Sequence, residues 1–172
     1  AKNMWGGALF GSSKNELFPE FWEEAPVERL VSRHAISFLT KDACLSIDFR
    51  DAHRASSSCP GFIMLRAKFD QWMAGKVEKA GAIIAPGLEV TDFIRDGQAV
   101  RGVRVEQEEF PAHLVILADG ANSLLAAKAG LRREFKAQDL KQGVKEVLRL
   151  PREVIENRFN LQGTEGAVME FV

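Results

Sequence analysis

The nine residues Val115-Ile116-Leu117-Ala118-Asp119-Gly120-Ala121-Asn122-Ser123 decide the fold that we expect for this chain. The first four belong to a short, continuous apolar run, which predicts a buried strand of a parallel sheet. Asp119 then lies at the carboxyl end of this strand, where ligands of open α/β sheets bind, and Gly120 permits close approach. Asn122 or Ser123 can cap the helix that follows, and the free N–H groups of that helix suit an anionic or polar group. The alternative is that Asp119 is a plain turn residue.

Hydrophobic periodicity predicts the elements on both sides of this stretch. The clearest is an amphipathic helix from Leu65 to Ala80, which Gly81 can end in a left-handed cap. The Asp96-Gly97 pair is typical of a type I′ hairpin turn, and Gly102 suggests a bulge in the second strand of that hairpin. The other predicted elements are a short helix over 15–22, strands over 36–40, 44–49, 82–85, 88–95, 98–106 and 113–118, a helix over 122–129 that ends at Gly130, a strand over 143–150, a helix over 151–158 and a strand over 168–172.

This order of elements predicts a mixed α/β (α+β) fold. The part from 65 to 130 is α/β in character, with the apolar run as a strand of its sheet. The stretches 27–62 and 139–172 predict antiparallel strands of a second sheet. No internal repeat and no low-complexity tract interrupts the chain.

Composition excludes several classes of protein. The chain has 172 residues, of which 46% are hydrophobic and 27% charged, and this is globular composition. Lys and Arg number 23 against 24 Asp and Glu, so the net charge of −1 argues against a nucleic-acid partner. No apolar run approaches the roughly 20 residues of a membrane span. The chain does not open on methionine and closes on an apolar stretch, so we expect an internal fragment of a larger protein.

The sequence contains no pattern that assigns a catalytic group or a metal ligand. Residues 6–13, Gly-Gly-Ala-Leu-Phe-Gly-Ser-Ser, nearly match a phosphate-binding P-loop but lack its lysine and the strand before it. Neither G-x-G-x-x-G nor G-x-S-x-G occurs. Cys44 and Cys59 match no metal spacing, and the three histidines are scattered. The basic stretch over 128–145 is interrupted by acidic residues, which favours a solvated face.

Several motifs together resemble one family. Residues 115–123 resemble the A-D-G-x-x-S motif of glutathione-reductase-type flavoproteins, which include aromatic hydroxylases, geranylgeranyl reductases and electron-transfer-flavoprotein:quinone oxidoreductases. Residues 65–72, followed by Ala-Gly-Ala at 80–82, are similar to their R-x-x-F-D helix. The opening residues 1–7 and two later stretches, 143–146 and 158–163, resemble the FixC-like branch of that family.

The resemblance implies that the cofactor is FAD. Asp119 with Gly120 would lie near the ribityl chain and the pyrophosphate, Arg66 would contact the cofactor, and the backbone of Val90 would meet the adenine. The opening loop would border the flavin. The candidate cofactor-binding residues are therefore Lys2, Asn3, Gly6, Gly7, Arg66, Val90, Asp119, Gly120, Asn122 and Ser123. The flavin carries the redox chemistry, so we name no catalytic acid, base or nucleophile.

The resemblance also implies a fold and a domain organisation. It implies part of an FAD-binding, Rossmann-like domain with a β-hairpin insertion, and antiparallel strands of a second sheet that covers substrate and flavin. The FAD-binding part would comprise 1–26 and 63–138, and the capping part 27–62 and 139–172. The G-x-G-x-x-G segment that holds the pyrophosphate in this family is not in the chain, so we expect the chain alone to fold, to bind FAD weakly or not at all, and to be inactive.

The implied function of the full-length protein is FAD-dependent electron transfer. It would accept electrons from an electron-transfer flavoprotein and pass them to a quinone or to a ferredoxin-like protein. The alternatives are a geranylgeranyl-reductase-like or aromatic-hydroxylase-like flavoenzyme, or a non-enzymatic interaction module. We expect a cytoplasmic location, with a peripheral position at the inner membrane left open.

Overall fold

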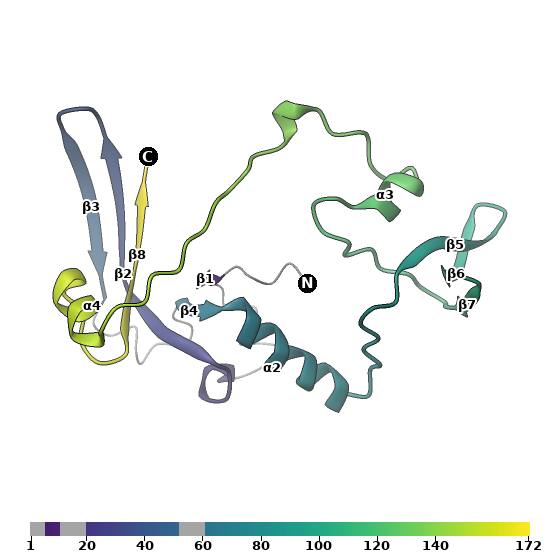
Figure 1. Ribbon diagram of the computed structural model, residues 1–172, viewed down its shortest axis with the longest axis horizontal. Helices are drawn as coiled ribbons and strands as arrows, with labels where there is room; N and C mark the ends of the chain where they lie inside the picture. Colours follow the sequence, from purple (N-terminus) through teal and green to yellow (C-terminus); the bar gives the residue numbers. More distant parts are fainter. Residues whose placement is uncertain (1–5, 11–19, 52–60) are drawn as a thin grey trace. The chain divides into compact units, whose positions relative to one another are not determined.

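The computed structural model describes residues 6–10, 20–51 and 61–172. The chain divides into two compact units, of which the first comprises Ala1–Ile83 with Lys145–Val172 and the second comprises Ile84–Val144. The assignment of a cofactor domain and a capping domain stays a prediction. The elements, of which Figure 1 labels the strands and the α-helices, are β1 (Gly6–Leu9), η1 (Phe21–Glu23), β2 (Val27–Leu39), β3 (Cys44–Arg50), β4 (Gly61–Leu65), α2 (Arg66–Lys79), β5 (Val90–Asp96), β6 (Ala99–Val105), β7 (Glu108–Pro111), α3 (Leu124–Lys128), η2 (Ala137–Asp139), α4 (Arg152–Phe159) and β8 (Glu165–Phe171).

The first unit is built on a five-stranded sheet around the long strand β2. Along one edge of β2 run two antiparallel partners, β4 opposite residues 27–31 and β3 opposite residues 33–39. The other edge pairs with β8, which runs parallel to β2 from Leu30↔Glu165 to Ser37↔Phe171. The expectation that all strands of this sheet are antiparallel is therefore wrong for β8. The connection between β2 and β8 runs over residues 40–164, which is far longer than the dozen or so residues that a parallel pair requires, and α4 is its last helix.

The core of the first unit is aromatic. Phe21 of η1, Phe62 of β4 and Phe69 of α2 are buried together with Ala25 and Met64. The rings of Phe21 and Phe62 meet edge to face at a centroid distance of 5.3 Å, a favoured geometry for aromatic pairs. The apolar stripe predicted on α2 is thus confirmed in its first half, where Phe69 packs into this cluster.

The predicted end of the long helix is confirmed. Gly81 has a φ of 92°, and its N–H donates to Glu78 O at 2.9 Å. The N–H of Ala82 donates to Val77 O at 3.2 Å, which completes a Schellman motif. A glycine is required here because other residues adopt this left-handed conformation at a cost.

The second unit contains a three-stranded antiparallel sheet in the order β5-β6-β7. The predicted hairpin is confirmed, but its register pairs Asp96 with Ala99, so the two-residue loop is Gly97-Gln98. Only Gly97 has a positive φ there, of 61°, whereas a type I′ turn needs two such residues, and the predicted turn type is wrong. The strand β7 was missed, because Glu-Glu-Phe-Pro shows no alternation.

The bulge predicted at Gly102 is confirmed. Ile94 pairs with Gly102 and Arg95 pairs with Val100, which leaves Arg101 as the extra residue. Gly102 has a φ of 156°, and a Cβ atom there would lie 2.2 Å from the carbonyl oxygen of Phe110 in β7. The bulge and the close approach of β7 therefore both require glycine at this position.

Three predicted strands are wrong. Residues 82–85, 113–118 and 143–150 form no strand, and Leu114 and Ile116 in the apolar run are 75% and 80% exposed. The physical reason is that a strand needs a neighbour, and no strand among the described residues pairs with any of these runs.

The helix predicted over 15–22 lies mostly outside the described residues, and only Phe21–Glu23 is seen, as a 3₁₀ turn. In the described part of the chain, no helix combines the length and apolarity that crossing a bilayer takes.

Candidate functional site

The predicted site residues fall into three groups. Lys2 and Asn3 lie outside the described residues. The first unit holds Gly6, Gly7 and Arg66, and the second unit holds Val90, Asp119, Gly120, Asn122 and Ser123. In the first unit, strand pairing places Gly6 opposite Leu65, next to Arg66. In the second unit, α3 connects the turn over 119–123 with the first residues of β5. The binding roles of all these residues stay predictions.

In the first unit, Gly6 and Gly7 lie beside the start of α2. Strand β1 pairs with β4 from Gly6↔Leu65 to Leu9↔Phe62, and Arg66 is the first helical residue after Leu65. A Cβ atom on Gly6 would lie 2.6 Å from the carbonyl oxygen of Met64, whereas a Cβ atom on Gly7 would meet nothing within 4 Å. Gly6 is therefore required by strand packing, and Gly7 leaves open space next to the strand-to-helix junction.

Arg66 forms a two-pronged ion pair with Asp70 one turn along α2. Its Nε lies 2.6 Å from Asp70 Oδ1 and its Nη2 lies 2.8 Å from Oδ2. These hydrogen bonds to the Asp70 carboxylate raise the pKa of Arg66. The Arg66 side chain is 46% exposed, so the pair adds little to stability but fixes the direction of the guanidinium. Sequence reasoning missed this role of Asp70, although the i, i+4 spacing could have indicated it.

In the second unit, Asp119 caps the short helix α3. Its Oδ2 accepts a hydrogen bond from the N–H of Leu125 at 3.0 Å. Ser123 stands at the N-cap position with a φ of 35° and makes no side-chain cap hydrogen bond. The predicted N-cap position of Ser123 is thus confirmed, but neither its side chain nor that of Asn122 caps the helix, because the carboxylate of Asp119 accepts the hydrogen bond from the Leu125 amide instead. This hydrogen bond supports the alternative that Asp119 is a turn residue. The second carboxylate oxygen, Oδ1, accepts no hydrogen bond among the described residues.

A lysine connects this turn to the strand that begins at Val90. Lys128, in the last turn of α3, donates from Nζ to the carbonyl oxygen of Thr91 at 2.9 Å and pairs with Asp92 Oδ2 at 2.9 Å. The hydrogen bond from Lys128 holds the pKa of Asp92 below its ordinary value. The helix α3 thus links the 119–123 turn at its start with the first residues of β5 at its end.

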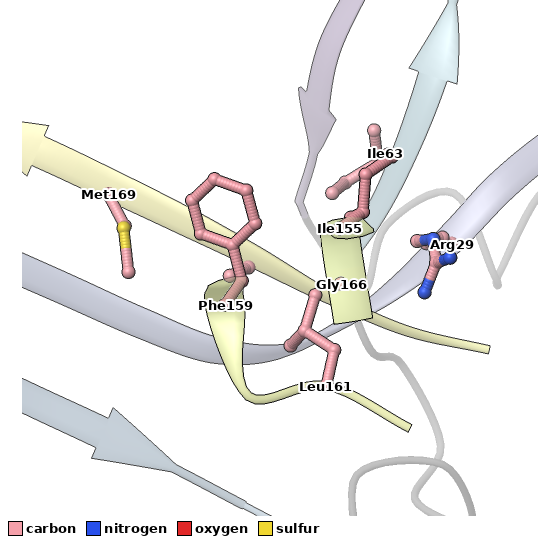
Figure 2. A pocket seen from close by; sticks show the side chains of 8 residues that line it. Arg29, Ile63, Ile155, Phe159, Leu161, Gly166 and Met169 are labelled. Carbon is pink, nitrogen blue, oxygen red and sulfur yellow. The ribbon is translucent and has the colours of Figure 1, made fainter. Parts of the chain in front are cut away.

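A pocket in the first unit contains no predicted site residue. It has a volume of about 200 Å³ and lies between α4 and the strands β2, β4 and β8. Figure 2 shows Phe159 and Ile155 of α4 and Leu161 gathered over the strand that carries Gly166 and Met169. Arg29 is its one charged lining residue, and that side chain donates to Glu165 O at 2.8 Å and pairs with Glu156 at 3.4 Å. Sequence reasoning could not find this pocket, because it depends on the parallel pairing of β8.

The second unit has an apolar pocket of its own. Its volume is about 280 Å³, and its lining residues are Phe93, Val100, His113, Leu114, Val115, Leu117, Ala129 and Leu131. Part of the exposed apolar run therefore borders a hollow next to the hairpin. Among the described residues, no group of three or more His, Cys, Asp or Glu is arranged to hold a metal ion.

Comparison with known proteins defines the class to which these features point. The chain is 41% identical over 172 residues to the protein FixC of Salmonella typhi and to FixC of Escherichia coli strain K12. It is 39% identical over 173 residues to the probable electron transfer flavoprotein-quinone oxidoreductase YdiS of Escherichia coli strain K12. No family model matches the chain.

The similarity extends along almost the whole chain and confirms the resemblance to FixC that the motifs indicated. The aligned part is 99% of this chain but 40% of the length of each of these relatives. The chain therefore spans about two fifths of the curated proteins that it matches.

Proposed function

We propose that the full-length protein is an FAD-dependent oxidoreductase of the FixC type, which takes electrons from an electron-transfer flavoprotein and passes them to a quinone. The observation that carries this proposal is the similarity to FixC and to YdiS along 99% of the chain. The name of YdiS supplies the electron-transfer flavoprotein and the quinone as the partner classes. The proposal has two further parts. A ferredoxin-like protein would be the alternative acceptor, and the protein would lie in the cytoplasm with peripheral membrane contact.

The described residues fit a bound FAD in three respects. Gly7 leaves open space beside the start of α2. Arg66, the first residue of α2, has an Nη1 group without a hydrogen-bond partner among the described residues. Asp119 has one carboxylate oxygen without a hydrogen bond in the described part of the chain. A guanidinium suits a phosphate and a carboxylate suits ribityl hydroxyl groups.

The residues of this chain would bind and orient the cofactor. Arg66, directed by Asp70, would neutralise negative charge on the cofactor, and Asp119 would accept hydrogen bonds from its hydroxyl chain. The backbone of Val90 would meet the adenine. A bound flavin supplies the electron transfer, and the protein positions and tunes it. The Rossmann-like character of the surrounding domain is part of this proposal.

Anaerobic reduction of the purified full-length protein tests the function. We expect bound flavin that is released as FAD on denaturation, and bleaching of its visible absorbance by a reduced electron-transfer flavoprotein but not by NADPH. Subsequent addition of a soluble quinone should restore the oxidised spectrum. Reduction by NADPH alone would instead support the hydroxylase-like alternative, and a protein that binds no flavin would contradict the proposal altogether.

A further inference from the structure

Arg132 lies where the chain returns from the end of α3 toward the turn that precedes it. Gly130 and Leu131 close the helix in a Schellman motif, with N–H groups that donate to Ala127 O at 3.0 Å and Ala126 O at 2.9 Å. Gly130 has a φ of 73°, which turns the chain back along the helix. A helix of this length rises only about 7.5 Å, so a long side chain just past its end can reach the turn before its start.

The guanidinium of Arg132 is held on three sides. Its Nη2 donates to the carbonyl oxygen of Asn122 at 3.0 Å, and its Nη1 donates to the carbonyl oxygen of Arg133 at 2.8 Å. Its central carbon lies 4.1 Å from the ring centroid of Phe135, which is a close cation–π contact. Two directed hydrogen bonds and a stacked ring fix both the position and the plane of the group.

The charge of Arg132 has no counter-ion among the described residues, where no carboxylate lies within ion-pair distance. Its Nε is buried and has no hydrogen-bond partner in that part of the chain. A partly buried cation and an unpaired N–H both cost free energy. The neighbouring Arg133 differs, because it forms a two-pronged pair with Asp139 at 2.8 and 2.9 Å. The arrangement of Arg132 therefore serves something other than ion pairing, and the contact it makes outside its own loop is with Asn122.

We propose that Arg132 is a positioning residue for the cofactor-binding turn over 119–123. By holding the Asn122 carbonyl, it keeps the backbone of that turn in the conformation in which Asp119 and Gly120 receive the hydroxyl and phosphate chain of FAD. This inference rests on the proposed function for the identity of the ligand. The role requires the planar, forked guanidinium and its stacking on Phe135, and positive charge alone does not fulfil it.

Two substitutions in the full-length protein separate positioning from charge. R132Q removes the positive charge, the forked donors and the stacked plane, whereas R132K keeps the charge but loses the fork and the stacked plane. We expect both variants to weaken FAD binding about tenfold, a typical effect for one charged hydrogen bond, as measured by quenching of flavin fluorescence. We also expect faster deuterium exchange of the backbone amides over 120–125 in the apoprotein of both variants, with the melting temperature close to that of the parent. R133Q is the matched control, and it should leave affinity and exchange unchanged because Arg133 does not contact the turn.

The outcomes distinguish this inference from the proposed function. If R132K binds FAD as tightly as the parent while R132Q does not, charge is sufficient and the positioning role is overturned. Parent-like exchange over 120–125 in both variants would also overturn it. If the unsubstituted protein binds no FAD, the proposed function fails, and the exchange measurement still tests whether Arg132 holds the turn. F135L is a second probe, since it should loosen the same amides without changing any charge.

Discussion

At the scale of a single residue, Gly102 shows how one position can determine a sheet. It combines the bulge of β6 with the close approach of β7, so any side chain there must displace the backbone of Phe110. We expect Gly102→Ala to lower the free energy of unfolding of the second unit by more than about 1 kcal/mol, because both backbone strain and the clash oppose the native state. Urea unfolding, with deuterium exchange over 90–111 to assign the change to this sheet, is the measurement.

Gly75 provides a control position at which we expect the opposite change in the free energy of unfolding. It lies within α2, and a Cβ atom there would meet nothing within 4 Å. Gly75→Ala should therefore raise the free energy of unfolding by about 0.5–1 kcal/mol through helix propensity. Equal losses from both substitutions would contradict the packing described for Gly102.

The ion pair between Arg33 and Asp48 makes stability depend on pH. Hydrogen bonds from Arg33 hold the pKa of Asp48 below its ordinary value of 3.8. A carboxyl whose pKa is lower in the folded state contributes stability that is fully present above its ordinary pKa and is lost as pH falls through the lowered value. Asp48→Asn should thus be less stable than the parent at neutral pH, and this difference should shrink progressively as the pH falls below 3.8.

Urea unfolding at neutral pH and at a series of pH values below 3.8 measures this effect. Asp42, in the turn between β2 and β3, forms no ion pair within the described part of the chain, so Asp42→Asn is the matched control. We expect no pH-dependent difference for that variant. A difference for Asp48→Asn that persists unchanged in acid would show that the pair with Arg33 is not its source.

At the scale of the element, α2 depends on the aromatic cluster beneath its first turns. Phe69 is 7% exposed and its ring lies 5.4 Å from that of Trp72, whereas Val77 on the same helix is 37% exposed. Phe69→Ala should cost about 3–5 kcal/mol, the range for a buried aromatic side chain. Val77→Ala should cost less than about 1 kcal/mol. Chemical unfolding followed by tryptophan fluorescence measures both, and similar costs at the two positions would contradict the finding that the aromatic cluster buries only the first turns of α2.

Elements with local signals could be predicted from the sequence, and elements that depend on distant partners could not. The α2 helix, its Gly81 cap, the β5–β6 hairpin and the Gly102 bulge are specified by residues within a few positions of one another. An apolar run such as 114–117 forms a strand only if another strand lies beside it, and local sequence does not contain that information. For the same reason, the parallel pairing of β8 with β2 was missed.

The residues of the candidate site show the same difference between local signals and distant contacts. Asp119 was marked by its place between an apolar run and a helix, and Arg66 was marked by the resemblance to the R-x-x-F-D motif. Their immediate partners, Asp70 and the Leu125 amide, are close in sequence and were within reach of spacing arguments. The contact of Arg132 with Asn122 depends on how the chain folds back after Gly130, which only the coordinates reveal.

At the scale of the whole molecule, the chain on its own is expected to hold FAD weakly or not at all. The predicted contacts over 1–172 involve the ribityl chain, the adenine and the border of the flavin, but no helix N-terminus with a G-x-G-x-x-G loop is present in the sequence to bind the pyrophosphate. Equilibrium dialysis of the purified chain against FAD measures this affinity. A stoichiometric yellow protein after purification without added cofactor would contradict the expectation.

The pairing of β8 with β2 also has a consequence for how the molecule is made. The first unit takes its strands from both sides of the second unit in the chain, whereas the second unit is one continuous stretch, Ile84–Val144. During translation, the whole of the second unit is synthesised before β8, so its antiparallel sheet can form while β2 still has one unpaired edge. The nascent chain therefore carries an open edge of β2 until β8 emerges, and this is the interval in which aggregation or chaperone binding would act on it.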